Sequence, residues 1–496
     1  TANAIQFGNQ GTFSATNPQA PPLLTVQPSA FLFTQLQSGT IQSQAQLTVD
    51  SGQSLVLLGG EINLNDAALT APDGRIELGG LSAPGTVDLA IADSTFRLAF
   101  PENTDRANLT SNNSGVNAQG NTGGSILINA RNIALNNKSF ITTGIFSDAT
   151  GSSDSPGSIN INATETINLQ QESEVRSLVG LNTTGRGGDI TIDAGSIFAS
   201  DVSGMFTLSL AQGDAGNITL RARDRIEFSN GSGAASILLF AQGAKAGNLT
   251  VSTGSLSLTN GSILGSLPAF GLGESGSVTI DARDQILVQG VDSEGDPSGI
   301  LSTLAYSEGK GGDLTINTGS LTVSQGGVIA TGTVGEGDAG TLTINARDTI
   351  SVSQGVISSA VAQGAEGNGG DINLTTGSLF LTNNGYLSSA SQGIGNSGNI
   401  TVKARDAIVI EGTQTEDSFS GILTTLVPNL ENLKSEVEGG DINLEANSLT
   451  MNDSAYLLTG NIFRIGNAGD ITINVLGNIT LSNSSQINSF TFGGQG

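Results

Sequence analysis

The chain has 496 residues, of which 69 are glycine and 18 phenylalanine, and it contains no cysteine, histidine or tryptophan. Its 18 Lys and Arg residues stand against 44 Asp and Glu residues, so the formal net charge is −26 at pH 7. These counts exclude disulfide bonds, thiolate or imidazole metal ligands and a histidine general base, and an acidic surface without a basic stripe argues against nucleic acid as a partner.

Residues 1–110 are rich in strand-forming residues but lie outside the periodic part of the chain. They include the runs "FGNQGTFSATNPQAPPLL" (7–24), "LTVDSGQSLVLLGGEINLNDAALTAPDGRIELGG" (47–80) and "GTVDLA" (85–90). A polar stretch at 101–124 then leads into a repeat. We therefore divide the chain into a first domain, residues 1–110, and a repeat domain, residues 111–496.

The repeat is a glycine, which we call the signature glycine, followed by x-Φ-x-Φ, where Φ is Ile, Leu or Val. Examples are "GDAGNITLRARD" (213–224) and "GDAGTLTINARD" (337–348), and successive copies are 28 to 42 residues apart, mostly near 30. The pattern predicts twelve structural units. Their glycines are Gly124, Gly157, Gly188, Gly216, Gly247, Gly276, Gly312, Gly340, Gly370, Gly398, Gly440 and Gly469.

Alternation within the repeat predicts short strands with one buried face. The two Φ positions are aliphatic in every unit, and the residue between them is usually Thr. Each unit offers two further strands; residues 311–334, for example, divide into "DLTIN", "SLTVS" and "GVIATG". Three strands in about 30 residues indicate one coil of a β-helix, with coils stacked about 4.8 Å apart. A β-sandwich or propeller is disfavoured because it needs antiparallel hairpins and a longer period.

A second rhythm extends over two units. Units ending in "ARD" alternate with units ending in "GSL" or "GSI", as at Arg347–Asp348 and Gly319. We expect each Gly coil to make room for the guanidinium groups of its neighbours. The residue after the signature glycine is mostly Asp or Asn, with Asp in adjacent units at Asp441 and Asp470, which alternation alone does not explain.

Two longer units carry similar acidic insertions, "QGVDSEGDPSGILSTL" (289–304) and "EGTQTEDSFSGILTTL" (411–426). Their carboxylates allow three interpretations: a calcium site, the acid pair of a polysaccharide-cleaving β-helix enzyme, or solvated turns on an acidic protein. We favour the turns, because no known calcium-loop motif is present. The weak calcium candidates are Asp292, Glu294, Asp296, Glu416 and Asp417.

Sugar binding lacks an obvious aromatic platform in the sequence. Tyr386 and Tyr456 occupy equivalent positions of different units and are expected to point outward. We expect them to be too far apart to form one site.

The run "SATNPQAPPLL" followed by "GQSLVLLGGEINLNDAALTAPDGRIELGG" resembles the filamentous-haemagglutinin-type secretion domain of two-partner secretion exoproteins. Units such as "GNAGDITIN" (466–474) resemble the repeats that follow that domain. The resemblance implies a right-handed parallel β-helix, exported through an outer-membrane β-barrel transporter of a Gram-negative bacterium. The family's "NPNGI"-like motif is missing, so residue 1 is expected to lie inside the secretion domain. Its C-terminal part would be residues 1–110, which we expect to be β-helical throughout.

These observations together predict an all-β, non-enzymatic structural or adhesive protein at the extracellular face of the cell, part of a fibre, matrix or adhesin. The expected partners are the export transporter, further copies of the chain bound end to end or laterally, and cell-surface glycans or host or neighbouring cells. No cofactor is expected, and calcium is the one weak candidate. The alternatives are a β-helix polysaccharide-degrading enzyme and a calcium-dependent surface-layer module.

Overall fold

A computed structural model describes residues 2–14, 27–35, 38–92, 95–146, 157–413, 420–426, 437–462 and 466–492. Strands make up 61% of the chain and no helix occurs among these residues, which confirms the all-β prediction. The chain forms two compact units: unit 1 is Thr1–Leu208 with Thr219–Arg223, and unit 2 is Ser209–Ile218 with Asp224–Gly496.

Unit 1 is mainly a parallel solenoid, in which each strand pairs with the strand one coil away. One buried ladder runs in register through Leu55, Ile76, Ile126, Ile159 and Ile190, all at most 7% exposed. Coiling therefore starts well before residue 111. The strands of this solenoid are β4 (Ile41–Ser43), β5 (Gln46–Thr48), β6 (Ser54–Gly59), β7 (Ile62–Asn65), β8 (Ala68–Thr70), β9 (Arg75–Gly80), β12 (Leu109–Asn112), β13 (Gly115–Asn117), β14 (Ser125–Ala130), β15 (Ile133–Asn136), β16 (Phe140–Ile145), β17 (Ile159–Ala163), β18 (Thr166–Leu169), β19 (Glu174–Val179) and β20 (Ile190–Ala199).

A separate antiparallel sheet lies against the first coils of unit 1. Its strand order is β11–β10–β3–β1–β2, and its side chains share a core with β6 and β9. Glu77 of β9 is buried, pairs with Arg75 and accepts a 2.6 Å hydrogen bond from the backbone N–H of Leu98 in β11. The sequence analysis placed all of residues 1–110 in the β-helix and missed this sheet. Its strands are β1 (Ala4–Gln6), β2 (Thr12–Ser14), β3 (Ala30–Phe33), β10 (Gly85–Ala92) and β11 (Thr95–Ala99).

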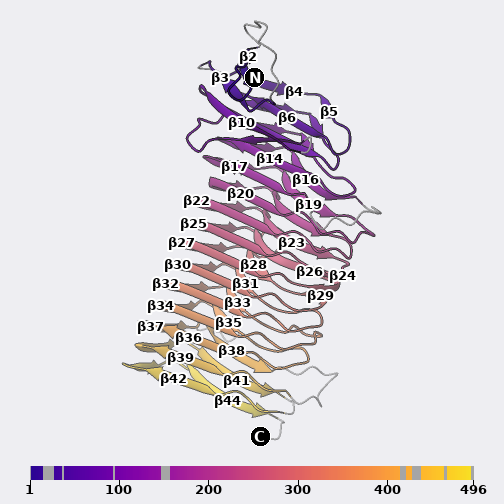
Figure 1. Ribbon diagram of the computed structural model, residues 1–496. Coiled ribbons are helices and arrows are strands. Elements are labelled where there is room, and N and C mark those ends of the chain that lie inside the picture. The colour runs from indigo at the N-terminus through magenta and orange to yellow at the C-terminus, as the bar shows by residue number, and fades with distance from the viewer. Residues whose placement is uncertain are drawn as a thin grey trace. The chain divides into compact units, whose positions relative to one another are not determined.

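Unit 2 is a right-handed parallel β-helix, as predicted. Val278, Leu314, Leu342, Ile372 and Ile400 form one fully buried ladder across five coils. In Figure 1 the strands that carry them, β27, β30, β32, β34 and β36, lie side by side in chain order. Stability comes from this stacking, because no single coil can bury its own apolar face.

The strands of unit 2 fall into two groups. In each coil, strands of the first group follow the repeated glycine along the chain, and strands of the second group come after them, before the next repeated glycine. The first group contains β25 (Leu249–Thr259), β27 (Val278–Gln289), β30 (Leu314–Ser324), β32 (Leu342–Ser353), β34 (Ile372–Thr382), β36 (Ile400–Ala404), β37 (Ala407–Glu411), β39 (Ile442–Ala446), β40 (Ser448–Asn452), β42 (Ile471–Val475) and β43 (Ile479–Leu481). The second contains β23 (Gly233–Leu239), β24 (Gln242–Lys245), β26 (Ile263–Glu274), β28 (Gly299–Ser302), β29 (Ala305–Glu308), β31 (Val328–Ala330), β33 (Val356–Ser358), β35 (Tyr386–Ser388), β38 (Ser420–Leu426), β41 (Ala455–Ile462) and β44 (Gln486–Phe492). Strands β21 (Gly204–Ser209) and β22 (Ile218–Ser229) contain residues of both units.

The signature glycines are required by close contact between coils. A Cβ atom on Gly370 would lie 2.1 Å from the carbonyl oxygen of Gly340, and one on Gly398 would lie 2.2 Å from that of Gly370. Buried hydroxyl groups form hydrogen bonds with the backbone of the same glycine: the Gly370 N–H donates to Ser359 Oγ (3.0 Å), and Ser389 Oγ donates to the Gly370 carbonyl (2.9 Å). The repeated glycine is therefore structural.

The Asp or Asn that follows the signature glycine forms a ladder of its own. Asp371 Oδ1 accepts the N–H of Asn399 (2.8 Å), Asn399 Oδ1 accepts that of Asp441 (2.8 Å), and Asp441 Oδ1 accepts that of Asp470 (2.8 Å). Both Asp and Asn carry the required side-chain oxygen. This explains why the chain tolerates Asp441 and Asp470 in adjacent coils: the Asp441 carboxylate is hydrogen-bonded to the backbone of the next coil.

The Arg and Gly coils alternate as predicted. A Cβ atom on Gly319 would lie 2.8 Å from Arg347 Nη2, and one on Gly254 would lie 2.8 Å from Arg283 Nη2. Each glycine thus leaves the space that a guanidinium group occupies. Arg347 also pairs with Asp348 (Nη2–Oδ2, 2.9 Å), and this hydrogen bond and charge raise the pKa of Arg347.

Candidate functional site

The first acidic insertion forms a tight turn after β27. Val291 and Pro297 make an antiparallel bridge across its base. Asp292 Oδ1 accepts the N–H groups of Glu294 and Asp296, both at 2.9 Å. This carboxylate therefore caps its own turn, as Asp side chains often do.

The second acidic insertion cannot be compared with the first, because Glu416 and Asp417 lie outside the described residues. Within the described ranges, no group of three or more Asp, Glu, His or Cys side chains is placed to hold a metal ion. Calcium binding at these loops stays a prediction.

Asp73, in the turn before β9, collects hydrogen bonds from two other coils of unit 1. Its Oδ1 accepts Thr122 N (2.7 Å), Thr122 Oγ1 (3.0 Å) and Gly123 N (3.1 Å), and its Oδ2 accepts Ser51 Oγ (3.1 Å). Burial alone would raise the pKa of Asp73, but hydrogen bonds from the backbone of Thr122 and Asn121 and from the two hydroxyl groups outweigh it. The pKa therefore lies below its usual value.

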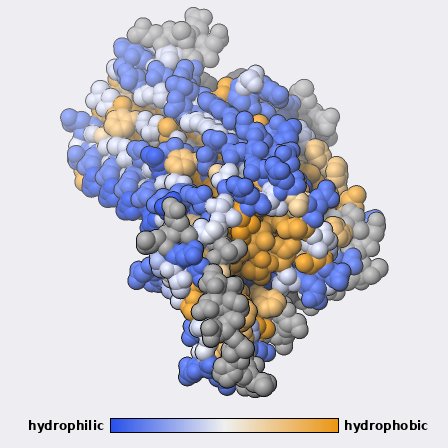
Figure 2. Space-filling model, turned by 90° about the horizontal axis from the view of Figure 1, so that it is seen from above, coloured by the Kyte–Doolittle hydropathy of each residue, from blue (hydrophilic) through white to orange (hydrophobic). Residues whose placement is uncertain are grey.

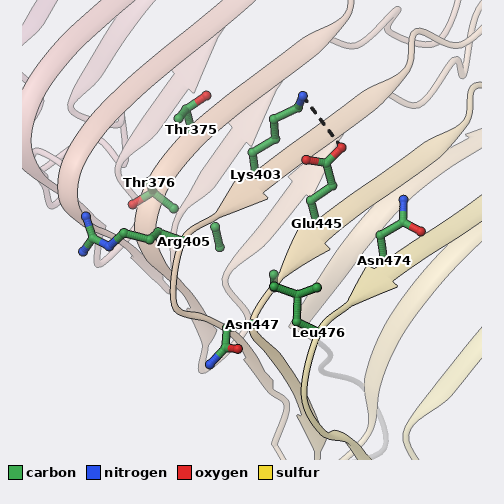
Figure 3. Close-up of a pocket in the computed structure, with 10 residues that line it drawn as sticks. Thr375, Thr376, Lys403, Arg405, Glu445, Asn447, Asn474 and Leu476 are labelled. Carbon is green, nitrogen blue, oxygen red and sulfur yellow. Dashed lines mark ion pairs between the residues drawn. The ribbon is translucent and has the colours of Figure 1, made fainter.

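An open groove of about 470 Å³ lies on the lateral face of unit 2 (Figure 3). Thr375, Lys403, Glu445 and Asn474 line it from four successive coils, in register on β34, β36, β39 and β42. Lys403 Nζ is 3.7 Å from Glu445 Oε1, and both side chains are 55% exposed. These charges are paired with each other, and the accessible surface of the groove is more apolar than polar.

The lower part of the groove is formed by Arg405, Asn447 and Leu476 (Figure 3). Arg405 is paired with Asp406 (Nη2–Oδ2, 2.8 Å), and this hydrogen bond and charge hold the pKa of Arg405 above its ordinary value. Leu476 is 92% exposed. A groove with this lining suits an extended ligand that presents apolar surface together with a few hydrogen-bonding groups.

Tyr386 and Tyr456 occupy one column of unit 2, separated by Gly421 in the coil between them. Both are half-buried, and burial raises the pKa of Tyr386. Their equivalence was predicted from the sequence. They lie two coils apart rather than in contact.

The sequence analysis missed an exposed aromatic row made by Phe240, Phe270 and Tyr306. All three side chains are at least 50% exposed. Figure 2 shows that the surface seen from above is mainly hydrophilic, with hydrophobic residues gathered in one area. The signal was present: the three residues are 30 and 36 residues apart, the same offsets as the coil pairings around them. Variable coil length concealed it.

The last described coil, formed by β42, β43 and β44, pairs on one side only within the described part of the chain. Its apolar residues are correspondingly open: Ile479 is 50% exposed and Leu481 is 43% exposed, whereas equivalent residues in inner coils are buried.

Comparison with known proteins identifies the N-terminal part of the chain. Residues 1–128 match the family model of the TPS secretion domain, the export domain of two-partner secretion exoproteins. No curated protein and no solved structure is significantly similar to the chain. No described helix is long and apolar enough to cross a membrane.

Proposed function

Because the chain is a two-partner secretion exoprotein with β-helix repeats, we propose that it works outside the cell as a structural and adhesive component of a surface fibre or matrix. Its TPS domain implies export through a partner outer-membrane transporter. Extracellular or outer-surface placement in a Gram-negative bacterium follows from that route. We propose no enzymatic activity.

The observation that carries the structural role is the continuous stack of parallel coils in unit 2, whose buried ladder runs through Val278, Leu342 and Ile400. Such a stack is an extended structural element in which each coil contacts only its neighbours. Copies of the chain can associate through exposed apolar side chains on this unit, of which Leu476 is 92% exposed. Self-association, end to end or laterally, is the proposed mode of fibre formation.

The adhesive role is supported by the lateral surface. Outward-facing side chains in the groove of Figure 3 repeat in register from coil to coil, so a long ligand can contact several coils at once. Repeated weak contacts of this kind produce avidity without any single strong site. Cell-surface glycans and the surfaces of neighbouring or host cells are the proposed targets.

Electron microscopy of the secreted protein tests the structural role. We expect fibres that lengthen with protein concentration, and we expect Leu476→Asp to abolish them because it places a charge at the exposed apolar side chain that is proposed to contact a second copy. Val202→Asp is the matched control, since Val202 is 64% exposed but lies in a turn of unit 1. Separate short particles at every concentration, or fibres from both variants, would contradict the proposal.

A further inference from the structure

Three aromatic side chains in unit 2 form an exposed stack. Phe240 and Phe270 are 5.9 Å apart between ring centroids with an interplanar angle of 23°, and Phe270 and Tyr306 are 5.7 Å apart with an angle of 6°. They follow residues that pair in register on β23, β26 and β29. Figure 1 shows β26 and β29 next to each other on the side of the second strand group.

Core packing does not explain these rings. Phe240 is 62% exposed, Phe270 is 50% exposed and Tyr306 is 66% exposed. Backbone preference does not explain them either, because their φ angles of 60°, 58° and 55° lie in the left-handed region, which bulky residues avoid. Unfavourable backbone conformations that recur at aligned positions are often kept for function.

The stack is open at the Tyr306 end. In the following coil, Leu304 bridges Thr333 and Glu308 bridges Glu336, so the position beside Tyr306 falls at Val334–Gly335. Gly335 contributes no side chain, and within the described residues no further ring stacks on Tyr306. A ligand with a flat apolar face can therefore continue the stack on this ring.

The surroundings of the stack are polar and acidic. Lys245 of β24 is paired with Glu274 of β26 at 2.6 Å (Nζ–Oε2). Glu308, Glu336 and Glu366 follow one another in bridged positions on three successive coils, and all three are exposed. Carboxylates at this spacing repel anionic ligands and can accept hydrogen bonds from hydroxyl groups.

We propose that the open face of Tyr306, supported from behind by Phe270, is the platform of a binding site for neutral polysaccharides, which extends the adhesive role proposed above. A sugar ring presents a flat C–H face that can stack on an aromatic ring and hydroxyl groups at its rim that can bond to the glutamates. Uronic and sialic acids are selected against, because their carboxylates would meet the glutamate column.

Affinity electrophoresis of the whole secreted protein tests the site, with gels containing hydroxyethylcellulose, galactomannan, dextran or polygalacturonate. We expect retardation by at least one neutral polymer and none by polygalacturonate. Tyr306→Ser should weaken the retardation about tenfold or more because it removes the platform, and Phe270→Ser should also weaken it because it removes the ring that supports Tyr306. Tyr306→Phe keeps the ring and should bind like the unaltered protein.

Phe146→Ser is the matched control, because Phe146 is 44% exposed and lies outside the stack. Circular dichroism melting curves establish that each variant is folded. The inference is overturned if no neutral polymer retards the protein, if Phe146→Ser weakens binding as much as Tyr306→Ser, or if polygalacturonate binds best.

Light scattering and microscopy of the same variants separate this inference from the proposed function. If Phe270→Ser and Tyr306→Ser leave fibres intact while retardation is lost, both proposals stand. If fibres form but neutral polymers never bind, the glycan site fails and the structural role survives. Loss of self-association in these two variants would instead make the stack a contact between copies and overturn the glycan site.

Discussion

Replacing each of the two adjacent glycines in "GNGGD" (367–371) by Ala should change the stability of the protein to very different extents. A Cβ atom at Gly370 would lie 2.1 Å from the carbonyl oxygen of Gly340 and 2.7 Å from its carbonyl carbon, and backbone atoms in a packed stack cannot rotate away. Gly370→Ala should therefore cost about 3 kcal/mol, the upper part of the usual range for overpacking. The cost should be concentrated in neighbouring coils, because coils contact only their neighbours.

Gly369→Ala is the control for this prediction. Its Cβ atom would meet the Gly398 nitrogen at 2.9 Å, and sister coils already carry Ala339 and Ser397 at that position. The backbone must shift slightly to relieve this contact, as the sister coils with Ala339 and Ser397 show is possible, and the reduced freedom of the unfolded chain offsets part of the cost. The destabilisation should therefore stay within about 1 kcal/mol, well below that of Gly370→Ala.

Hydrogen exchange read by mass spectrometry measures both variants coil by coil. Gly370→Ala should raise local opening in the coils beside it about 100-fold, since each 1.4 kcal/mol is a factor of ten. Gly369→Ala should leave protection nearly unchanged. Equal effects of the two substitutions, or full protection in Gly370→Ala, would refute the argument from coil contact.

Three further predictions concern carboxylates. Asp73→Asn should lower the melting temperature at pH 7. Because the pKa of Asp73 is lowered in the folded protein, the carboxylate stabilises the unaltered protein above about pH 4, and this stabilisation should vanish as the pH falls through the lowered pKa. Melting curves of both proteins from pH 2 to 7 measure this difference. Asp371→Ala should cost about 1 kcal/mol in urea unfolding because the Asn399 N–H loses its acceptor, whereas Asp371→Asn keeps an oxygen there and should be nearly neutral. Asp292→Asn should melt like the unaltered protein with or without a calcium chelator, since an amide oxygen can still cap the turn; calcium stabilisation that disappears in this variant would favour the calcium hypothesis instead.

The repeat section was predictable because its information is local. An aliphatic–Thr–aliphatic triplet such as Leu342–Ile344 shows its alternation within three residues, and the buried and half-buried pattern of β32 follows it. Arg347 and Gly319 were predicted as partners because their units alternate in the sequence, and the distance between them agrees. Because every coil must meet the same packing requirements, each copy of the repeat supports the same prediction of a β-helix.

The candidate sites were less predictable because they depend on which residues meet across coils of unequal length. Val278 pairs with Leu314 and Leu314 pairs with Leu342, so one coil offset is 36 residues and the next is 28. A difference of this size between coil offsets changes which turn residues lie beside one another in neighbouring coils. For that reason the acidic insertion was found as a motif, whereas the use of the Asp292 carboxylate in its own turn was not.

The all-β class and the parallel coiling of the repeats were predictable from the sequence, because periodicity and composition act through short-range burial. The resemblance to an exported two-partner secretion protein came from a specific N-terminal run of residues. The antiparallel sheet of β1, β2, β3, β10 and β11 emerges only in the folded chain, since it depends on the shared core around Phe33 and Leu98. The structure also decided that Phe240, Phe270 and Tyr306 form one stack. The physical reason is the same in both cases: contacts between residues far apart in the chain are set by turn lengths and packing that no local pattern records.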